Sequence, residues 1–279
     1  MSSPWQLDFY RRPLQDTAGK PLWELLLCDA EMAFSYGETC PQSEANPQWL
    51  QNQLSQAIER AGAPPSEIQI FRPQTLPLAE LVGKALKIPV VAKRDLPTLK
   101  QWLAQRAAWY TNLTTYTGEP YNPLDIERLP PLPLPENLWG DQWQFAGISN
   151  ADLLRFQFEP VPYLSIPPEL RPLELGLPIT TLIPGVIIDG GRQSRTLAQW
   201  LQSVQPVFVK YMTGAPDGLI LEAGLNDRWV LATFDDSDVQ GAANTFEQRK
   251  QAAKGLHFLL VRPDDSGMTY TGLWLLQEI

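Results

Sequence analysis

Hydrophobic and polar positions along the first third of the chain change from a two-residue period to a helical period. Residues 5–36 alternate in the manner of strands around a turn-rich segment, which predicts a hairpin followed by more strand. Residues 46–62 then place apolar side chains at helical spacing. Asn46 is the expected N-cap, Pro47 fits the first helical position, and Gly62 fits the stop. This segment therefore predicts the first helix.

The pattern after this helix alternates between short strands and helices. Residues 67–74 and 89–94 predict strands, and residues 76–88 and 95–110 predict helices, the second of them capped by Asp95. The order is hairpin, strand, helix, strand, helix, strand, helix. Such an order indicates an α+β, α/β-like domain with a partly parallel sheet.

Closely spaced prolines separate this pattern from the rest of the chain. Residues 118–138 favour an extended, polyproline-like path because prolines exclude both helix and central strand. We therefore predict an N-terminal domain over 1–117, a proline-rich linker over 118–138 and a C-terminal domain over 139–279. A second proline-containing stretch, 160–184, also carries many apolar residues and is expected to lie against a surface.

The remaining chain predicts a second α+β domain. Its expected elements are a helix, three strands, a long helix and two closing strands, at 194–204, 206–212, 218–224, 228–234, 237–255, 256–263 and 270–278. Within this set, the order helix, three strands, helix, strand resembles the restriction-endonuclease-like core. That core takes catalytic carboxylates and a lysine from its second and third strands. Here Asp217 and Glu222 are present, but the strand over 228–234 carries neither acid nor lysine, so the catalytic set is incomplete.

Net charge first argues against nucleic acid as a partner. The 279 residues carry a formal charge of -9, and phosphate is repelled by an acidic chain unless its basic residues are segregated. The residues up to position 110 include 11 basic and 11 acidic side chains, so by difference 11 basic and 20 acidic ones follow. The acidity therefore belongs to the C-terminal part, and the N-terminal domain is close to neutral.

A basic run in the N-terminal domain is the leading candidate site. Within residues 84–106 a single acid, Asp95, stands among the cations, and the preceding strand ends in Arg72. Parallel strands end on a common side, so we expect Arg72 and the Lys93–Arg94 pair to share a sheet edge. Cations for phosphates and aromatic faces for bases are what single-stranded RNA binding requires. The candidate RNA-binding residues are Arg72, Lys93, Arg94, Lys100, Trp102 and Arg106. The simpler interpretation, solvated helix faces with Trp102 in the core, stays open.

Two carboxylates on neighbouring predicted strands offer an alternative. Asp8 and Asp29 would suit a metal-dependent nuclease, because paired carboxylates can hold two divalent ions. The element order of the N-terminal domain also resembles the ribonuclease H-like fold with its mixed sheet and helices. However, the later strand ends carry Arg72 and Lys93–Arg94 where further acids would be needed. Cleavage is therefore a hypothesis that ranks below binding, and we expect no enzymatic activity.

Few residues are available for metal, redox or cofactor chemistry. The 2 cysteines are too few for a disulfide scaffold, and the 1 histidine, His257, rules out a multi-histidine metal site. No nucleotide-binding fingerprint is present, so no cofactor or metal is expected. The chain shows no apolar run long enough to span a membrane and no targeting segment at its start. We therefore expect a cytoplasmic protein in a reducing compartment.

Several segments together resemble a known family. The strands WQLDFYRRP and PLWELLLCD, the strand end FRPQ, the helix LKQWLAQRAAWY, the segment LPENLWGDQWQF, the helix TLAQWL and the late strands KGLHFLLV and GLWLL resemble the Tab/Atab family of RNA-binding proteins from cyanobacteria and plastids. The resemblance extends from Trp5 to the last strand. It implies binding of single-stranded mRNA at a 5′ untranslated region, translation of photosystem subunit mRNAs and photosystem biogenesis.

The resemblance also bears on location and on partners. A cyanobacterial member would act in the cytoplasm, whereas the plant relatives would act in the plastid stroma. Protein partners in photosystem assembly are a further expectation. A third hypothesis also stays open, in which the proline-rich segment and the acidic C-terminal domain recruit a protein partner without direct RNA contact.

Overall fold

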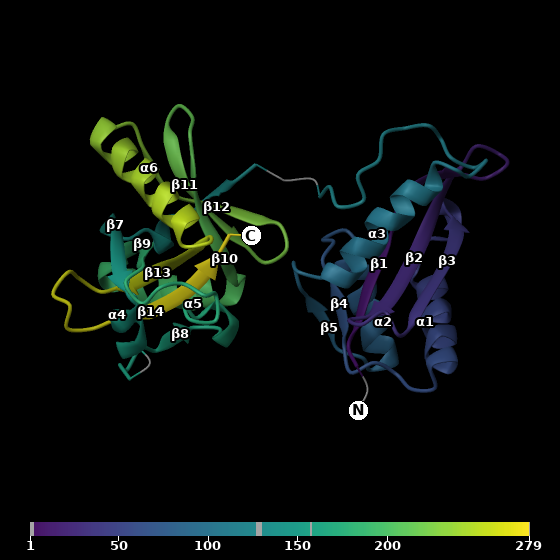
Figure 1. Cartoon of the computed structure of the whole chain (residues 1–279), viewed down its shortest axis with the longest axis horizontal. Helices are drawn as coiled ribbons and strands as arrows, with labels where there is room; N and C mark the ends of the chain where they lie inside the picture. The colour runs from purple at the N-terminus through teal and green to yellow at the C-terminus, as the bar shows by residue number, and fades with distance from the viewer. Residues whose placement is uncertain (1–2, 127–129, 157, 279) are drawn as a thin grey trace. The chain divides into compact units, whose positions relative to one another are not determined.

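Two compact units make up the chain. The computed structural model describes residues 3–126, 130–156 and 158–278, and its contacts divide into the units Met1–Arg128 and Leu129–Ile279 (Figure 1). Each unit combines helices with sheet, which confirms the predicted α+β class. Within the described residues, no helix is both long and apolar enough to cross a membrane.

The first unit is built on a mixed five-stranded sheet. Its strands lie in the order β3-β2-β1-β4-β5, and their bounds are Trp5–Gln15 for β1, Pro21–Asp29 for β2, Ser35–Pro41 for β3, Ile68–Ile70 for β4 and Val90–Ala92 for β5. The first three strands pair antiparallel, whereas β4 runs parallel to both β1 and β5. The predicted partly parallel sheet is therefore confirmed.

Helices cover both faces of this sheet. They are α1 (Pro47–Ala61), α2 (Leu76–Leu86) and α3 (Pro97–Tyr110), with the short turn η1 (Gln42–Glu44) before α1. Alternate residues of β2 belong to different cores: Leu25 and Leu27 pack with α1 and α2, whereas Leu26 and Cys28 pack with α3. Successive strand residues point to opposite faces, so α3 lies across the sheet from the other two helices.

Local sequence signals set most of the helix ends. The Asn46 side chain accepts a hydrogen bond from the Trp49 amide at 3.0 Å, and Gly62 adopts a left-handed φ of 79° after α1. Both expectations for α1 are confirmed. The expectation for Asp95 is wrong, because α3 begins at Pro97 with Leu96 at the N-cap position and no capping hydrogen bond from a side chain. Leu96 is buried in the core beneath α3, which fixes the helix start by packing.

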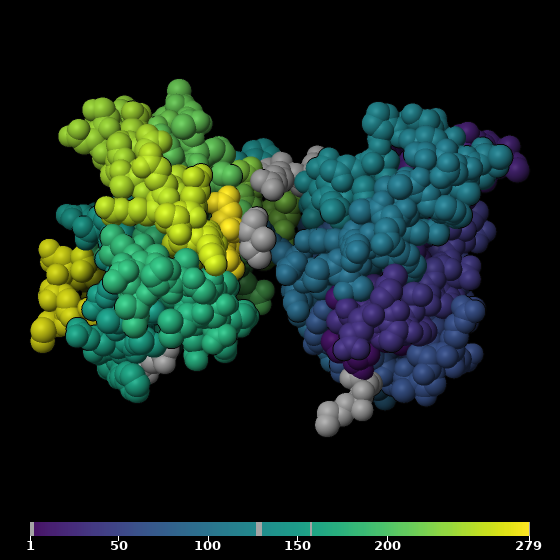
Figure 2. All heavy atoms as spheres, in the orientation of Figure 1, coloured from purple at the N-terminus to yellow at the C-terminus, as the bar shows by residue number. Residues whose placement is uncertain are grey.

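The proline-rich stretch 118–138 contributes contacts to each unit. Pro123 accepts a hydrogen bond from Arg72, and Ile126 packs on the core beneath α3. After residues 127–129, which lie outside the described residues, Leu132–Pro133 form the short strand β6 of the second unit. In Figure 2 the blue-to-teal atoms of α3 and the residues after it cover much of one face of the first unit.

The second unit contains two sheets. One has the order β10-β11-β12-β6, with β10 at Pro206–Met212, β11 at Asp217–Ala223 and β12 at Asp227–Phe234. The other has the order β7-β9-β13-β14-β8, at Gln142–Ser149, Leu182–Asp189, Leu256–Arg262, Gly272–Gln277 and Tyr163–Ser165 respectively. The helices are α4 (Asn150–Arg155), α5 (Ser194–Val204) and α6 (Ser237–Ala252), and the short turns are η2 (Glu136–Leu138), η3 (Pro168–Leu170) and η4 (Gly191–Gln193).

The predicted helices and strands of the second unit are present, but the sequence pattern missed three strands of its second sheet. The helix over 194–204 has the predicted bounds, whereas β7, β8 and β9 were not expected. Pro184 lies within β9 opposite Gly147 of β7, whereas pairing of β9 with β13 begins only at Gly185. Pro184 therefore lies where β9 has a partner strand on one side only, a position that tolerates proline.

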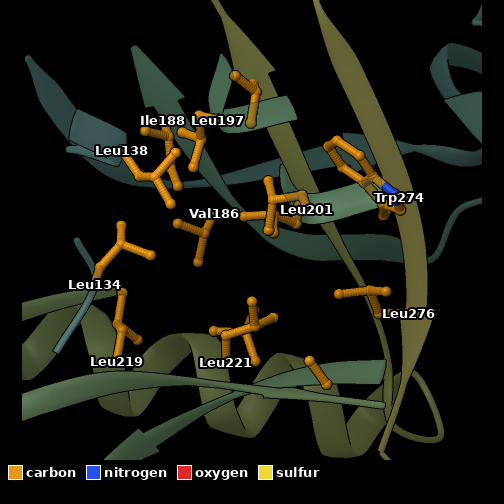
Figure 3. Close-up of a cluster of buried hydrophobic side chains, with 14 of the residues drawn as sticks. Leu134, Leu138, Val186, Ile188, Leu197, Leu201, Leu219, Leu221, Trp274 and Leu276 are labelled. Atoms are coloured by element: carbon orange, nitrogen blue, oxygen red, sulfur yellow. The ribbon is translucent and has the colours of Figure 1, made fainter. Parts of the chain in front are cut away.

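The largest hydrophobic core of the second unit lies between its two sheets. Leu219 and Leu221 of β11 face Val186 and Ile188 of β9, with Leu197 and Leu201 of α5 beside them (Figure 3). Leu134 and Leu138, from the segment around η2, reach the same core. The start of this unit is thus fixed by burial of its own leucines.

Candidate nucleic-acid interface

The ends of β4 and β5 bring three of the candidate cations to one edge of the sheet. These strands pair parallel with Ile70 opposite Ala92, and the Lys93 amide donates to the Ile70 carbonyl at 2.8 Å. Arg72 and the Lys93–Arg94 pair therefore follow the carboxyl ends of neighbouring strands, as predicted. The Lys93 side chain is exposed, and that of Arg94 is half-buried.

The rest of the basic run does not belong to this edge. Lys84 and Lys87 lie at the end of α2, before β5 begins, and both are exposed. Since β5 runs from Val90 to Ala92, its length separates these lysines from Lys93 and Arg94, which follow it. The cations that are continuous in sequence are thus divided between opposite ends of one strand.

Arg72 points into the unit instead of toward solvent. Its side chain is 2% exposed, its Nε donates to Asp8 Oδ1 at 2.7 Å, and its Nη2 donates to the Pro123 carbonyl at 2.7 Å. Its guanidinium also lies over the Tyr10 ring, 4.3 Å from the centroid. The Arg72 guanidinium is therefore paired with Asp8 and donates to groups inside the unit, so it is not available to bind a phosphate.

Asp8 and Arg72 belong to a buried ionic network that the sequence pattern did not reveal. Arg12 donates from Nη2 to Asp8 Oδ2 at 2.8 Å and from Nε to Glu24 Oε2 at 3.1 Å. Asp8 and Arg12 lie four residues apart on β1 and so share a face, while Glu24 reaches them from β2. The only sequence signal for this network was the presence of charged residues at these strand positions.

Two tyrosines complete the network. The Arg12 Nη1 donates to the Tyr121 hydroxyl at 3.0 Å, and the Tyr110 hydroxyl donates to Glu24. Burial opposes the charge of Arg12, but Asp8 and the other acidic neighbours raise its pKa above the ordinary value. Burial raises the pKa of Tyr110 and of Tyr121 as well, so both hydroxyls keep their protons at neutral pH. The charged side chains of the network are therefore satisfied by one another and by the two hydroxyls, within the interior of the first unit.

Arg106 and Trp109 form the outer end of this network on α3. Arg106 donates from Nη2 to Glu24, and its guanidinium lies 4.1 Å from the Trp109 ring centroid. The Trp109 side chain is 44% exposed. The Arg106 guanidinium therefore stacks on one face of the Trp109 indole, while part of the ring remains accessible to solvent. Sequence reasoning missed Trp109, because apolar residues lie around the whole circumference of this helix and do not mark an outer face.

The two remaining candidates on α3 differ in exposure. Trp102 is half-buried and packs on the core beneath α3, with its ring near Gly37 of β3. Lys100 is half-buried, with its Nζ 5.8 Å from the Phe71 ring centroid. Lys100 thus lies beside the same strand end as Lys93, and Trp102 has a packing role. The cationic edge is defined from here on as Lys93, Arg94 and Lys100.

The two carboxylates proposed for metal ions do not come together. Asp29 lies opposite Trp5 in the β1–β2 register, three positions from Asp8, which corresponds to about 10 Å along the strand. Asp29 accepts hydrogen bonds from the Ala33 and Phe34 amides and so closes a turn. Across the described ranges, no group of three or more His, Cys, Asp or Glu side chains could hold a metal ion. The geometry therefore gives the nuclease hypothesis no support.

The acidic and histidine candidates of the second unit have structural partners. Asp217 accepts from the Tyr211 hydroxyl and the Gly214 amide, and Glu222 is paired with Arg228. His257 is fully buried and accepts a hydrogen bond from the Val209 amide at 2.8 Å through Nε2. These contacts explain the three residues by local structure.

The fold and the cationic edge together define a two-unit α+β protein with its basic surface on the first unit. Residues 4–106 match the family model described as "RNA-binding protein Tab2/Atab2 N terminal". Residues 121–277 match "RNA-binding protein Tab2/Atab2, C-terminal domain". The chain belongs to the Tab2/Atab2 family of RNA-binding proteins, which confirms the resemblance seen in its sequence.

Two curated relatives and one solved structure were compared with the chain. The "Protein TAB2 homolog, chloroplastic" of Zea mays is 28% identical over 293 residues, which cover 99% of this chain and 71% of the relative. The Arabidopsis thaliana protein of the same name is 29% identical over 284 residues, with coverages of 99% and 74%. A chain from the simian T-cell lymphotropic virus intasome in complex with PP2A regulatory subunit B56 gamma is 14% identical with a TM-score of 0.29, and the match covers 52% of this chain and 62% of that one.

Proposed function

We propose that the protein binds single-stranded mRNA, at a 5′ untranslated region, through the cationic edge of its first unit. The observation that supports this site is the placement of Lys93, Arg94 and Lys100 around the carboxyl ends of β4 and β5. Phosphates would approach Lys93 first, because its side chain is exposed. Trp109, accessible on α3, would stack on a base.

Family membership supports a role in translation of photosystem subunit mRNAs. The two curated relatives are chloroplastic by name, and we place this chain by analogy in the stroma of a plastid or the cytoplasm of a cyanobacterial cell. Protein partners in photosystem assembly belong to the same proposal. We further propose that the chain acts by binding and not as an enzyme, because arginines surround the central carboxylate Asp8.

The strand order of the first unit supports a ribonuclease H-like topology. An antiparallel β1–β2–β3 set that continues through parallel β4 and β5 is the arrangement that this fold requires. Ligands of open α/β sheets bind outside the carboxyl ends of the parallel strands, and here the cationic edge lies at that end of β4 and β5. For the second unit, the restriction-endonuclease-like likeness stays a proposal with Asp217 and Glu222 in structural roles.

A salt-dependent titration with a matched control tests the site. The RNA is the 5′ untranslated region of a photosystem subunit mRNA, with a shuffled sequence of the same length beside it. Lys93→Glu with Arg94→Glu should lower the affinity at least tenfold and flatten the salt dependence, by about 0.7 in slope per lost phosphate contact. Lys84→Glu with Lys87→Glu makes the same charge change at the other end of β5 and should leave affinity nearly unchanged.

The control separates a local site from general electrostatics. Equal losses in the two double variants would show that net charge alone governs binding. Full affinity in the Lys93 and Arg94 variant would place RNA on another surface. Equal affinity for the shuffled sequence would remove the proposed preference for the untranslated region.

A further inference from the structure

An open apolar pocket lies in the second unit between its two sheets. Its volume is about 370 Å³. Five side chains that line it also belong to the core cluster in Figure 3, and these are Leu134, Leu138, Val186, Ile188 and Leu219. An apolar side chain that enters this space removes its surface from water, which is favourable.

One wall of the pocket is the edge of a strand. Val230–Thr233, four consecutive residues of β12, line the pocket. The β11–β12 register shifts here, since Leu219 lies opposite Ala232 and Ile220 opposite Val230, so Leu231 is an extra residue in β12. Among the described residues, β12 pairs with β6 only at Trp229 and Val230, and the chain then leaves through Pro133. The backbone of β12 beyond Val230 is thus an open edge beside an apolar pocket.

Trp139 stands at the mouth of the pocket in a fixed orientation. Its indole Nε1 donates to the Leu134 carbonyl at 2.8 Å, yet 56% of the side chain is exposed. An indole that is anchored through its N–H and exposes its ring offers apolar area at little cost in conformational entropy. The Trp139 ring can therefore pack against an apolar side chain that enters the pocket.

The surroundings of the pocket are acidic. Its lining residues are all uncharged, and the segments that supply them carry the exposed carboxylates of Glu136, Asp141 and Asp235. The sequence contains no lysine or arginine between positions 130 and 154 or between 229 and 248. A partner with positive charge is favoured here, and a phosphate backbone is repelled.

We propose that this edge binds an extended, cationic segment of a partner protein. The segment adds a strand to the β10-β11-β12-β6 sheet along Leu231–Thr233 and inserts one apolar side chain beneath Trp139. Backbone hydrogen bonds to an open strand edge provide affinity in this mode of recognition, and a pocket for alternate side chains provides specificity. Lysine or arginine side chains of the segment meet the surrounding carboxylates.

A labelled peptide serves as the probe. It has seven residues, alternates lysine with valine and carries phenylalanine at its centre. Fluorescence anisotropy with the full chain should show saturable binding that weakens at least tenfold in Trp139→Ala. Phe158→Ala removes another exposed aromatic side chain of the same unit, 88% exposed, and should leave the affinity unchanged. Circular dichroism spectra of both variants should match that of the unchanged protein.

Changes to the peptide separate the three parts of the proposal. Proline at alternate positions removes the N–H donors, alanine at the centre removes the anchor, and glutamate for lysine reverses the charge. Each change should weaken binding at least tenfold. Amide shifts in the NMR spectrum of the full chain should concentrate on 139–143 and 230–234.

Other outcomes would overturn the proposal. Equal binding of the proline peptide, or of the glutamate peptide, would contradict strand addition or charge pairing respectively. A Trp139→Ala variant with full affinity would move the site elsewhere. Sedimentation that shows a dimer dissociated by Trp139→Ala would identify a second copy of this chain as the occupant, and an RNA crosslink at Trp139 would identify a base.

Discussion

Arg72 donates from Nε to Asp8 Oδ1 at 2.7 Å, across 64 residues of sequence and away from solvent. This pair converts the central carboxylate of the first unit into part of a closed ionic network. Arg12 holds the other oxygen of Asp8. The same two arginines occupy the space around Asp8 that a metal-dependent nuclease would leave to metal ions.

The stability of the first unit should depend on both members of this pair together. Arg72→Met leaves a buried carboxylate short of a partner and should cost about 3 kcal/mol. Asp8→Asn combined with Arg72→Met should cost less than the two single changes added together, because neither charge is then left alone. Hydrogen exchange of peptides from residues 3–15, followed in urea, measures both effects. Strictly additive losses would show that the two side chains act independently.

Alanine variants of Trp109 and Trp102 should show different effects, one on RNA affinity and the other on stability. Trp109→Ala removes an exposed ring and should weaken RNA binding by about 1–3 kcal/mol with little change in thermal stability. Trp102→Ala removes contacts with the core beneath α3 and should mainly lower stability. Filter binding and thermal melts of the same samples make the comparison. The reverse result would identify Trp102 as the stacking residue.

Divalent metal ions should not make the protein a nuclease. Asp8 is held by Arg12 and Arg72, and Asp29 caps a turn on the same sheet. Labelled RNA incubated with the protein and Mg²⁺ or Mn²⁺ should therefore remain intact. Cleavage that disappears in Asp8→Asn would overturn the proposal of a binding protein.

His257 should make the second unit less stable as the pH falls. Its Nε2 accepts from the Val209 amide, and its Nδ1 faces the Gly255 carbonyl at 2.8 Å, so the ring is neutral with the proton on Nδ1. Burial lowers its pKa from 6.5 to about 3. The unfolded chain then binds the extra proton between these values, and stability present above pH 6.5 is lost on acidification, by about 1.4 kcal/mol per pH unit at most.

The pH range from 5 to 6.5 isolates this effect, because most carboxylates are still ionised there and the chain has 1 histidine. Urea unfolding of the second unit, followed by hydrogen exchange over residues 256–262, gives the slope. His257→Gln should flatten it while keeping an acceptor for the Val209 amide. An equal slope in the variant would assign the titration to another group.

The sequence by itself determined the elements that depend on neighbours along the chain. Asn46 and Gly62 define the ends of α1 through a cap and a left-handed residue, and the alternation of apolar positions predicted most strands. It also placed Arg72 and Lys93 at a common edge, because parallel strands end on one side. These are local or topological consequences of residue type.

Only the tertiary structure decided which of these residues face solvent. Arg72 is buried because Asp8 and Pro123, 64 and 51 residues away, supply its partners, whereas Lys93 meets no such enclosure and is exposed. The open edge of β12 likewise follows from where Pro133 ends its pairing with β6. Burial depends on residues brought together from distant positions, and a pattern read along the chain does not contain that information.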